Sequence, residues 1–465
     1  MQWLLFLGIV TAVNAGREAY ERLGYFWHIT DIHYDGHVNF HGDARKGCWR
    51  PDYEGGKGKG AKRQMGRFGD YSCDSTWELI ESAAQLMTTR HYDNVEFVLW
   101  TGDGMSHAAR RLPEFRQKEL LQNLTDLLGK TFKSQFVFPA LGHDDPFLKD
   151  ELTKMWSRWL PTDSLKTFQS GGYYIFERKM LKLQIVVLNT NLMKRGENDE
   201  DALQQWIWLE KVLYKFQKSG ETVYLVGHVP PGSNERQRGG PFSPTTHFAY
   251  LDPHNKKYLE IVRKYAGIIA GQFFGHLHSD TFRVIYSTNG KPISWAMVAP
   301  SVTPRRTNDG PNNPGLRLYK FDKDSGQVFD YTQFYLDLST ANANENRIAE
   351  WTVEYNFSTY YSINEISAGS LHALADKFTQ DNPYGNSIFS KYYRSNSVRL
   401  NTSPSTGCDS TCAHTHFCAI TRVDYDEFHQ CMQTAPSALS ASSSSVPRPL
   451  VLLVLFVSVV INLLV

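Results

Sequence analysis

The stretch Ile269-Ala-Gly-Gln-Phe-Phe-Gly-His-Leu-His278 joins an apolar, β-type run to a polar corner that carries two histidines. Four earlier segments have the same form, in which a short apolar run ends in a motif rich in Gly, His and Asp. These motifs are Asp31-Ile-His33, Gly102-Asp103-Gly104, Gly142-His143-Asp144-Asp145 and Gly227-His228-Val-Pro-Pro. Loops at the ends of sheet strands can converge on one point. We therefore expect these side chains to meet although they lie far apart in the sequence.

The pattern of strands and helices around the motifs predicts the fold class. The motifs follow predicted strands at 25–29, 95–101, 135–141, 222–226 and 268–274. Apolar residues recur at helical spacing between them, at 77–87, 115–128, 203–216 and 258–265. After His278 come further β-type runs at 282–286, 293–299, 316–321 and 328–336. Alternating strands and helices followed by strands alone indicate a layered α/β fold, with a β-sandwich core flanked by helices.

The motifs contain the ligand types needed for two metal ions. Neutral imidazoles and carboxylates suit zinc, iron or manganese. A carboxylate between two histidine-bearing loops can bridge a pair of ions about 3.5–4 Å apart. Such a pair serves phosphate esters, because the ions hold the phosphoryl oxygens and activate a water for attack on phosphorus.

The order of the motifs resembles that of the calcineurin-like metallophosphoesterase superfamily. Longer stretches resemble the acid sphingomyelinase-like phosphodiesterases, and among them the glycosylphosphatidylinositol-anchored b-type members. Besides 269–278, these stretches are Phe26-Trp-His-Ile-Thr-Asp-Ile-His33, Trp100-Thr-Gly-Asp103, Val187-Leu-Asn-Thr-Asn191 and Gly227-His-Val-Pro-Pro-Gly232. The resemblance extends over residues 25–431 and implies the same layered fold.

The resemblance also implies roles for single residues. Asp31, His33 and His278 would hold one zinc ion. His228 and His276 would hold the second, and Asp103 would bridge the two. A further histidine, His107, would contact the scissile phosphate or protonate the leaving oxygen.

The third motif departs from the Gly-Asn-His-Asp of the family, and two alignments are open. If the Asn is deleted, His143 is the acid histidine of the family and the second ion has lost an amide ligand. If two substitutions occurred, His143 replaces the Asn as a ligand and Asp144 stands where the acid should be. An ordinary aspartate is ionised at neutral pH, so His107 would then have to supply the proton.

Both ends of the chain carry targeting patterns. Residues 1–15 have an apolar run and small residues at the cleavage positions, as in a secretory signal peptide. Residues 432–449 form a linker, with an expected lipid-attachment residue between 437 and 443, and 450–465 are almost entirely apolar. This order predicts a glycosylphosphatidylinositol anchor. The alternative is a transmembrane helix, for which the run is shorter than the roughly twenty residues that span a bilayer.

The cysteines and sequons agree with export. All six cysteines lie after the signal peptide, which predicts disulfides. Spacing suggests a pair between Cys48 and Cys73 and two more bridges near the end, for which the family pattern gives Cys408–Cys412 and Cys418–Cys431. Predicted glycosylation sites are Asn123, Asn356 and Asn401. We expect a catalytic domain at 25–340 and a small helical, disulfide-stapled subdomain at 341–431.

Several residues lie outside the motifs. His28, His37, His41, His91 and His247 are interpreted as structural or surface residues. The loop 304–314 either lines the substrate groove, with Arg305 or Arg306 on phosphate, or has no such role. A formal net charge of +1 argues against a protein that coats nucleic acid.

The sequence therefore predicts a secreted, zinc-dependent phosphodiesterase attached to the outer membrane leaflet, at the cell surface or in lysosomes. Its substrates would be nucleotides, phosphocholine compounds or sphingomyelin-type phospholipids. The alternative is a catalytically weakened surface protein that binds a lipid or another ligand and modulates receptors. The altered third motif is the reason to keep that alternative.

Overall fold

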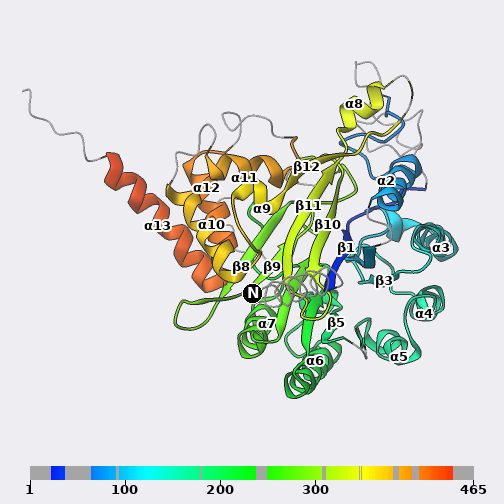
Figure 1. Ribbon diagram of the computed structural model, residues 1–465, viewed down its shortest axis with the longest axis horizontal. Coiled ribbons are helices and arrows are strands. Elements are labelled where there is room, and N and C mark those ends of the chain that lie inside the picture. The colour runs from blue at the N-terminus through cyan, green and yellow to red at the C-terminus, as the bar shows by residue number, and fades with distance from the viewer. Residues whose placement is uncertain are drawn as a thin grey trace, which may run out of the picture.

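A computed structural model shows two sheets packed face to face between groups of helices (Figure 1). It describes residues 22–443, apart from 37–63, 91–93, 179–180, 237–248, 306–309, 345, 347, 381–386 and 401–407. The predicted signal peptide, the apolar tail and Cys48 lie outside the described residues. So do Asn401, His37, His41, His91, His247 and Arg306.

The first sheet has the strand order β12-β11-β10-β1-β2-β3. Its strands are β1 (Leu23–Ile29), β2 (Val95–Trp100), β3 (Phe136–Pro139), β10 (Gly315–Asp322), β11 (Val328–Tyr335) and β12 (Thr352–Asn356). β1, β2 and β3 are parallel, and the pairs from β1 through β10 and β11 to β12 are antiparallel.

The second sheet has the order β4-β5-β6-β7-β9-β8. Its strands are β4 (Tyr174–Phe176), β5 (Leu183–Val187), β6 (Thr222–Val226), β7 (Ile269–Phe274), β8 (Thr281–Tyr286) and β9 (Pro292–Val298). The strands β5, β6, β7 and β9 are parallel, whereas β4 and β8 pair antiparallel at the two edges.

Aromatic side chains fill the space between the sheets. Phe26 of β1 stacks on Tyr319 at 4.8 Å between ring centroids, and its edge meets Phe273 of β7 at 5.3 Å. On β6, Tyr224 faces this core, while Val223 and Leu225 face the helices on the other side. The central parallel strands are thus buried on both faces, which explains their nearly continuous apolar sequences.

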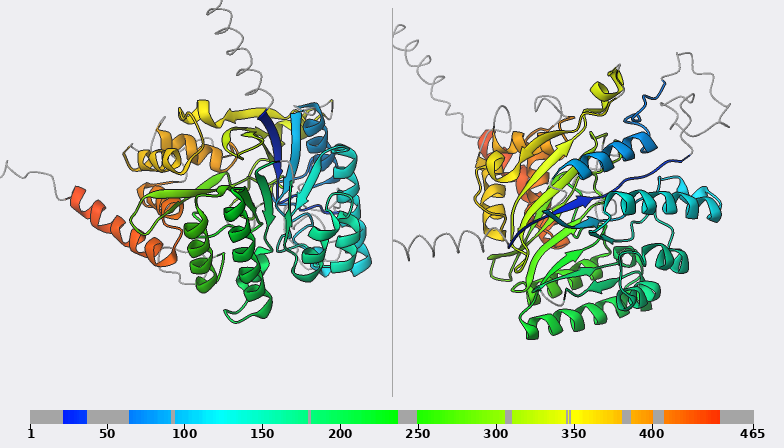
Figure 2. Two further views of the ribbon diagram at one scale, coloured as in Figure 1. Left: turned by 60° about the horizontal axis from the view of Figure 1, so that its bottom comes forward. Right: turned by 45° about the vertical axis from the view of Figure 1, so that its right-hand side comes forward.

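Helices cover the outer faces of both sheets (Figures 1 and 2). The helices beside the first sheet and β4 are α2 (Trp77–Thr89), α3 (Glu114–Thr131), α4 (Lys149–Trp156) and α5 (Thr162–Gly171). The second sheet packs against α6 (Glu200–Ser219) and α7 (Asp252–Tyr265). The segment after β11 contributes α8 (Leu338–Ala343), α9 (Phe357–Tyr361), α10 (Ala368–Gln380), α11 (Ile388–Asn396), α12 (Ser410–Thr421) and α13 (Tyr425–Ser443).

The predicted layered α/β fold is confirmed. Each predicted strand and helix exists close to its expected bounds, except that the helix expected at 258–265 already begins at Asp252. Residues 341–431 are mostly helical, as expected, but they also contain β12. This strand pairs with β11 and so belongs to the first sheet. Helices α10 and α12 pack against β8 and β9 of the second sheet. The C-terminal segment therefore adds a strand to the first sheet and covers part of the second.

The two predicted C-terminal disulfides are confirmed. Cys408 is bonded to Cys412, and Cys418 to Cys431. The second bridge links α12 to α13 and so holds these two helices together. Among helices in the described ranges, none combines the length and apolar character needed to span a bilayer.

A buried ion pair joins β8 to the loop after β6, and a residue of the C-terminal segment also binds its carboxylate. Arg283 of β8 donates to the carboxylate of Glu235 at 2.8 Å, and both side chains are fully buried. Asn396, at the end of α11, donates to the same carboxylate at 3.3 Å. Burial would raise the pKa of Glu235, but the charge of Arg283 holds it at about 2.

Glu235→Ala should lower the free energy of unfolding by about 3–5 kcal/mol, because it leaves the guanidinium of Arg283 buried without its counter-charge. Lys215→Ala is the matched control, since it breaks an exposed ion pair with Glu177 and should cost no more than about 1 kcal/mol. Urea denaturation of both variants measures the difference. Equal losses would contradict the structural role of the buried pair.

Candidate metal centre

The strand register brings the five motifs to one edge of the sandwich. Ile29 of β1 is level with Trp100 of β2, and Trp100 with Pro139 of β3. In the second sheet, Val226 of β6 is level with Phe273 of β7. The loops that follow these strands therefore begin side by side, as the sequence predicted.

Backbone hydrogen bonds tie the loops together. The amide of Asp31 donates to Gly102 at 3.0 Å, and the amide of His33 donates to Asp103 at 3.0 Å. In the second sheet, Gly275 donates to the carbonyl of His228 at 2.9 Å. The motif residues are thus held by the main chain before any side-chain contact is made.

The backbone is strained at the predicted ligands. Of eight described non-glycine residues with positive φ, five are predicted metal ligands. They are Asp31 (50°), His33 (46°), Asp103 (50°), His276 (69°) and His278 (53°). Such conformations cost about 1–3 kcal/mol each and persist where the surrounding structure enforces them, commonly at functional sites.

The first group of donor atoms comes from Asp31, His33, Asp103 and His278. Ligand atoms of the first three lie within 4.8 Å of one another. Nε2 of His278 lies 3.2 Å from the carboxylate of Asp31 and 3.2 Å from Nε2 of His33. All four side chains are buried.

The second group contains Asp103, His143, His228 and His276, whose ligand atoms also lie within 4.8 Å of one another. Oδ2 of Asp103 is 2.8 Å from Nδ1 of His143 and 3.0 Å from Nε2 of His228. The same oxygen is 3.7 Å from Nε2 of His33 in the first group. Asp103 thus occupies the shared position between the two groups.

Backbone carbonyls orient three of the imidazoles. Nδ1 of His33 donates to Met105 at 3.0 Å, Nδ1 of His228 to Thr101 at 2.8 Å and Nδ1 of His278 to Arg305 at 2.8 Å. A carbonyl can only accept, so each Nδ1 carries a proton, and in the neutral imidazole each Nε2 has the lone pair. This arrangement is typical of histidines that bind metal through Nε2.

The electrostatics of the cluster fit a pair of cations. Oδ1 of Asp31 and Oδ2 of Asp103 are buried without a hydrogen-bond partner. Burial would raise the pKa of Asp103, but His228 and His143 hold it well below its usual range. Conversely, burial lowers the pKa of His228, but Asp103 raises it to about 9. The carboxylates thus favour positive charge at the centre, which divalent ions supply.

In the third motif, His143 lies in the second donor group and Asp145 has a different task. The half-buried Asp145 accepts the amides of Gly104 at 2.8 Å, Met105 at 3.2 Å and Gly142 at 2.9 Å through its carboxylate. Asp145 therefore fixes the backbone around Asp103. The place of His143 in the second donor group is what the alignment with two substitutions expects.

Two neighbours fix this motif beside Asp103. The amide of Asp144 donates to Oδ1 of Asp103 at 2.7 Å. A Cβ on Gly142 would lie 2.1 Å from the same oxygen, so no side chain fits there. Asn191, the last residue of the Val187-Leu-Asn-Thr-Asn191 stretch, donates to the carbonyl of Gly142 at 2.9 Å.

His107 lies beside the first donor group, but its imidazole binds a different carboxylate, that of Asp74. Its ring stacks on His33 with centroids 4.0 Å apart. Its Nδ1 donates to Asp74 at 2.8 Å, and its own amide donates to the other oxygen of Asp74 at 3.1 Å. Burial and the charge of His33 lower the pKa of His107, and Asp74 opposes that shift.

Sequence reasoning missed Asp74. This residue lies in no motif, and its importance comes only from its contact with His107. The loop 304–314, which was expected either to line the substrate groove or to have no such role, does reach the site through Arg305. Its Nη1 donates to Asp74 at 3.2 Å, so in this structure the guanidinium meets a carboxylate at the site.

The remaining predicted residues lie away from the centre or support it. His28 is buried, its Nε2 lies 2.9 Å from Oγ1 of Thr101, and burial lowers its pKa to about 3, so it is structural. Asn356 is exposed at the end of β12, as a glycosylated residue must be, whereas Asn123 is half-buried on α3.

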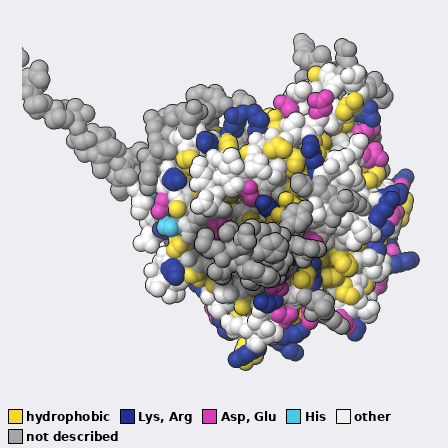
Figure 3. Space-filling view, viewed as in Figure 1, with side chains coloured by type: hydrophobic (Ala, Val, Ile, Leu, Met, Phe, Trp, Pro, Cys, Tyr) yellow, Lys and Arg dark blue, Asp and Glu magenta, His cyan; other side chains and the backbone are white. Residues whose placement is uncertain are grey.

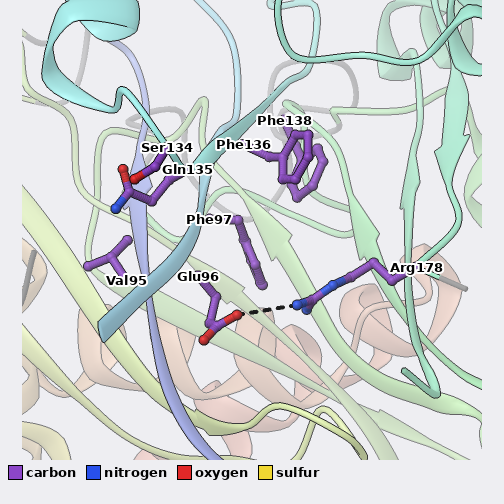
Figure 4. Close-up of a pocket in the computed structure, with 8 residues that line it drawn as sticks. All are labelled: Val95, Glu96, Phe97, Ser134, Gln135, Phe136, Phe138 and Arg178. Carbon is purple, nitrogen blue, oxygen red and sulfur yellow. Dashed lines mark hydrogen bonds and ion pairs between the residues drawn. The ribbon is translucent and has the colours of Figure 1, made fainter. Parts of the chain in front are cut away.

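A separate cavity of about 310 Å³ opens at the other ends of the strands (Figure 4). It is lined by the first residues of β2, by 134–136, by Phe138 and by Arg178, which pairs with Glu96 at 3.3 Å. No motif residue lines it. On the molecular face in Figure 3, Lys and Arg side chains are interspersed with Asp and Glu.

Comparisons with known proteins agree with this geometry. The calcineurin-like phosphoesterase family model matches residues 24–280, and the acid sphingomyelin phosphodiesterase C-terminal region matches residues 291–437. The chain is 34% identical to human acid sphingomyelinase-like phosphodiesterase 3b over 98% of both chains.

Two other relatives carry different names. The chain is 34% identical to the Bos taurus cyclic GMP-AMP phosphodiesterase SMPDL3A, over 88% of this chain and 91% of the relative. It is 31% identical to sphingomyelinase phosphodiesterase C of Dictyostelium discoideum, over 88% of this chain and 92% of the relative.

If His143 is a ligand of the second ion, His143→Ala should reduce the metal content from roughly two ions per chain to roughly one. His143→Asn should keep both, because an amide oxygen can take the same position. His107→Asn serves as the control and should also keep both ions, because its Nδ1 is engaged by Asp74. Elemental analysis of the purified variants measures this. Full zinc content in His143→Ala would contradict the assignment.

Proposed function

This chain belongs to the acid sphingomyelinase-like phosphodiesterases of the calcineurin-like phosphoesterase family, and we propose that its two donor groups hold a pair of zinc ions for phosphodiester hydrolysis. Asp31, His33 and His278 would hold the first ion. His143, His228 and His276 would hold the second. The observation that carries the proposal is the buried Oδ2 of Asp103, which lies 3.0 Å from Nε2 of His228 in one group and 3.7 Å from Nε2 of His33 in the other.

Zinc suits the donor set. The second group offers three imidazoles and one carboxylate, and the first offers two imidazoles and two carboxylates. Nitrogen-rich sites of this kind favour zinc or iron over magnesium and calcium, which prefer all-oxygen ligands. When bound, a pair of such ions polarises the phosphoryl oxygens and lowers the pKa of a water.

The chain's own residues supply the rest of the chemistry. Asp103, fixed by the amide of Asp144, keeps the two donor groups at a constant separation. His107 lies against the first group and is partly open to solvent. Because an aspartate in place of the family's acid histidine is normally ionised at neutral pH, we assign proton donation to His107 and not to Asp144.

The substrate we propose is a phosphodiester or phosphoanhydride, with small soluble compounds such as nucleotides or phosphocholine esters preferred. Relatives named for cyclic GMP-AMP and for sphingomyelinase activity match this chain over similar lengths. Sphingomyelin-type lipids are the second group to test.

Release of p-nitrophenol from bis-(p-nitrophenyl) phosphate should depend on the metal pair. Dialysis against a chelator should abolish turnover, and zinc should restore it. Asp103→Asn should bind less zinc and show only background turnover, because the shared oxygen changes its charge and basicity. Two bound ions without turnover on any phosphodiester would instead support a ligand-binding surface protein.

We also propose that the protein is secreted and held on the outer leaflet by a glycosylphosphatidylinositol anchor. Disulfides near the C-terminus and an exposed Asn356 sequon support export. The apolar residues 450–465 support the anchor.

A phosphatidylinositol-specific phospholipase C should release the protein from intact cells in active form, because the anchor would be its sole membrane attachment. Deletion of 450–465 should divert it to the medium. Retention on the cells after lipase treatment would indicate a transmembrane helix instead.

A further inference from the structure

We propose that Asp74 is a positioning residue that fixes the imidazole of His107 for proton donation to the leaving oxygen, with Arg305 completing the support. This inference rests on the proposed function. It adds to the site a carboxylate and a guanidinium that do not bind the metal pair.

Asp74 holds His107 at two points. One carboxylate oxygen accepts Nδ1–H of the ring at 2.8 Å, and the other accepts the backbone N–H of the same residue at 3.1 Å. A carboxylate can only accept, so Nδ1 carries a proton and Nε2 is the nitrogen that can exchange one with a substrate. Contact with both ring and main chain fixes the tautomer and the rotamer together.

The position of Asp74 is itself fixed relative to the metal ligands. The next residue, Ser75, donates its amide to the carbonyl of His33 at 3.0 Å. Thr76 then begins α2 by accepting the amide of Leu79 through its side chain. The carboxylate is completely buried. Asp74 therefore moves with the first donor group and not with the surface.

Arg305 links Asp74 to His278, a predicted ligand of the first ion. Its guanidinium donates to Oδ2 of Asp74 at 3.2 Å. Its carbonyl accepts Nδ1–H of His278 at 2.8 Å. One residue thus orients a metal-binding imidazole and the carboxylate behind His107.

The ring of His107 faces the centre. It lies nearly parallel to His33, at an interplanar angle of 6°. One of its ligand atoms lies within 4.8 Å of those of His33 and His278. Its side chain is 18% exposed, which gives solvent access for the return of a proton. A phosphodiester on the first donor group would therefore have His107 beside it.

In the proposed step, His107 protonates the leaving oxygen. A water oxygen bonds to phosphorus and gives up one of its protons to solvent, while the bond from phosphorus to the leaving oxygen breaks. The proton on Nε2 of the His107 imidazolium passes to that leaving oxygen and gives an alcohol. A neutral imidazole remains, with Nδ1–H still donated to Asp74, and solvent returns the proton to Nε2.

This chain depends on the dyad because its third motif has an aspartate where the family has its acid histidine. No second histidine acid is available there, since His143 lies in the second donor group. Support of His107 should therefore control how fast poor leaving groups depart.

The test compares Asp74→Asn with the unaltered protein on two esters, p-nitrophenyl methyl phosphate and phenyl methyl phosphate. Nitrophenolate leaves without a proton, whereas phenolate departs more readily when protonated. We expect kcat for the phenyl ester to fall by about 10²-fold or more and kcat for the nitrophenyl ester by less than about tenfold. Zinc content and KM should stay unchanged.

Two further variants keep the test independent of folding defects. His107→Gln should show the same dependence on the leaving group, and the double variant should be no slower than His107→Gln alone, since the two residues act as one unit. Arg305→Met should give a smaller loss with the same pattern. Asp70→Asn, in the turn just before Asp74, should leave both rates unchanged.

The outcomes separate the two hypotheses. No turnover of either ester by the zinc-loaded, unaltered protein would overturn the proposed function. Turnover of both esters, with equal losses in Asp74→Asn or additive losses in the double variant, would overturn the positioning role alone.

Discussion

The buried carboxylate of Asp103 is the constraint on which the rest of the structure depends. Its Oδ2 is shared by imidazoles from both sheets, at 3.0 Å from His228 and 3.7 Å from His33. A carboxylate in that position requires that the parallel strands of both sheets end at the same level, so that their loops come within hydrogen-bonding distance. It also requires a glycine at 142, because a Cβ there would collide with Asp103. The left-handed backbone at the ligands follows, because no relaxed loop would place them so close.

The sequence predicted the sandwich and the meeting of the motifs because both depend on local signals. A strand buried on both faces reads as a continuous apolar run, and the Gly-His and Gly-Asp corners follow directly. The strand β12 was missed because Thr352–Asn356 lies among helices and is exposed except at two positions, so its pairing with β11 is a tertiary effect. Asp74 was missed for a similar reason, since its role arises from contact with His107.

The third motif shows what geometry adds to a sequence pattern. Sequence alone left Gly142-His143-Asp144-Asp145 with two alignments, one with a deleted Asn and one with two substitutions. In the structure, the carboxylate that accepts the neighbouring backbone amides belongs to Asp145. If His143 holds the second ion, as proposed, an imidazole takes the place of the family's amide ligand. The proton for the leaving group must then come from His107.

Two buried arginines explain how further carboxylates can lie next to this centre without competing for its cations. Asp280 follows the ligand His278 by two residues and is paired with Arg317 of β10 at 2.5 Å. Glu235, beyond His228, is paired with Arg283 of β8 at 2.8 Å. An ion pair of this kind contributes little net stability compared with an apolar contact. Its consequence here is that the carboxylates of Asp280 and Glu235 are each paired with an arginine and not with the donor groups.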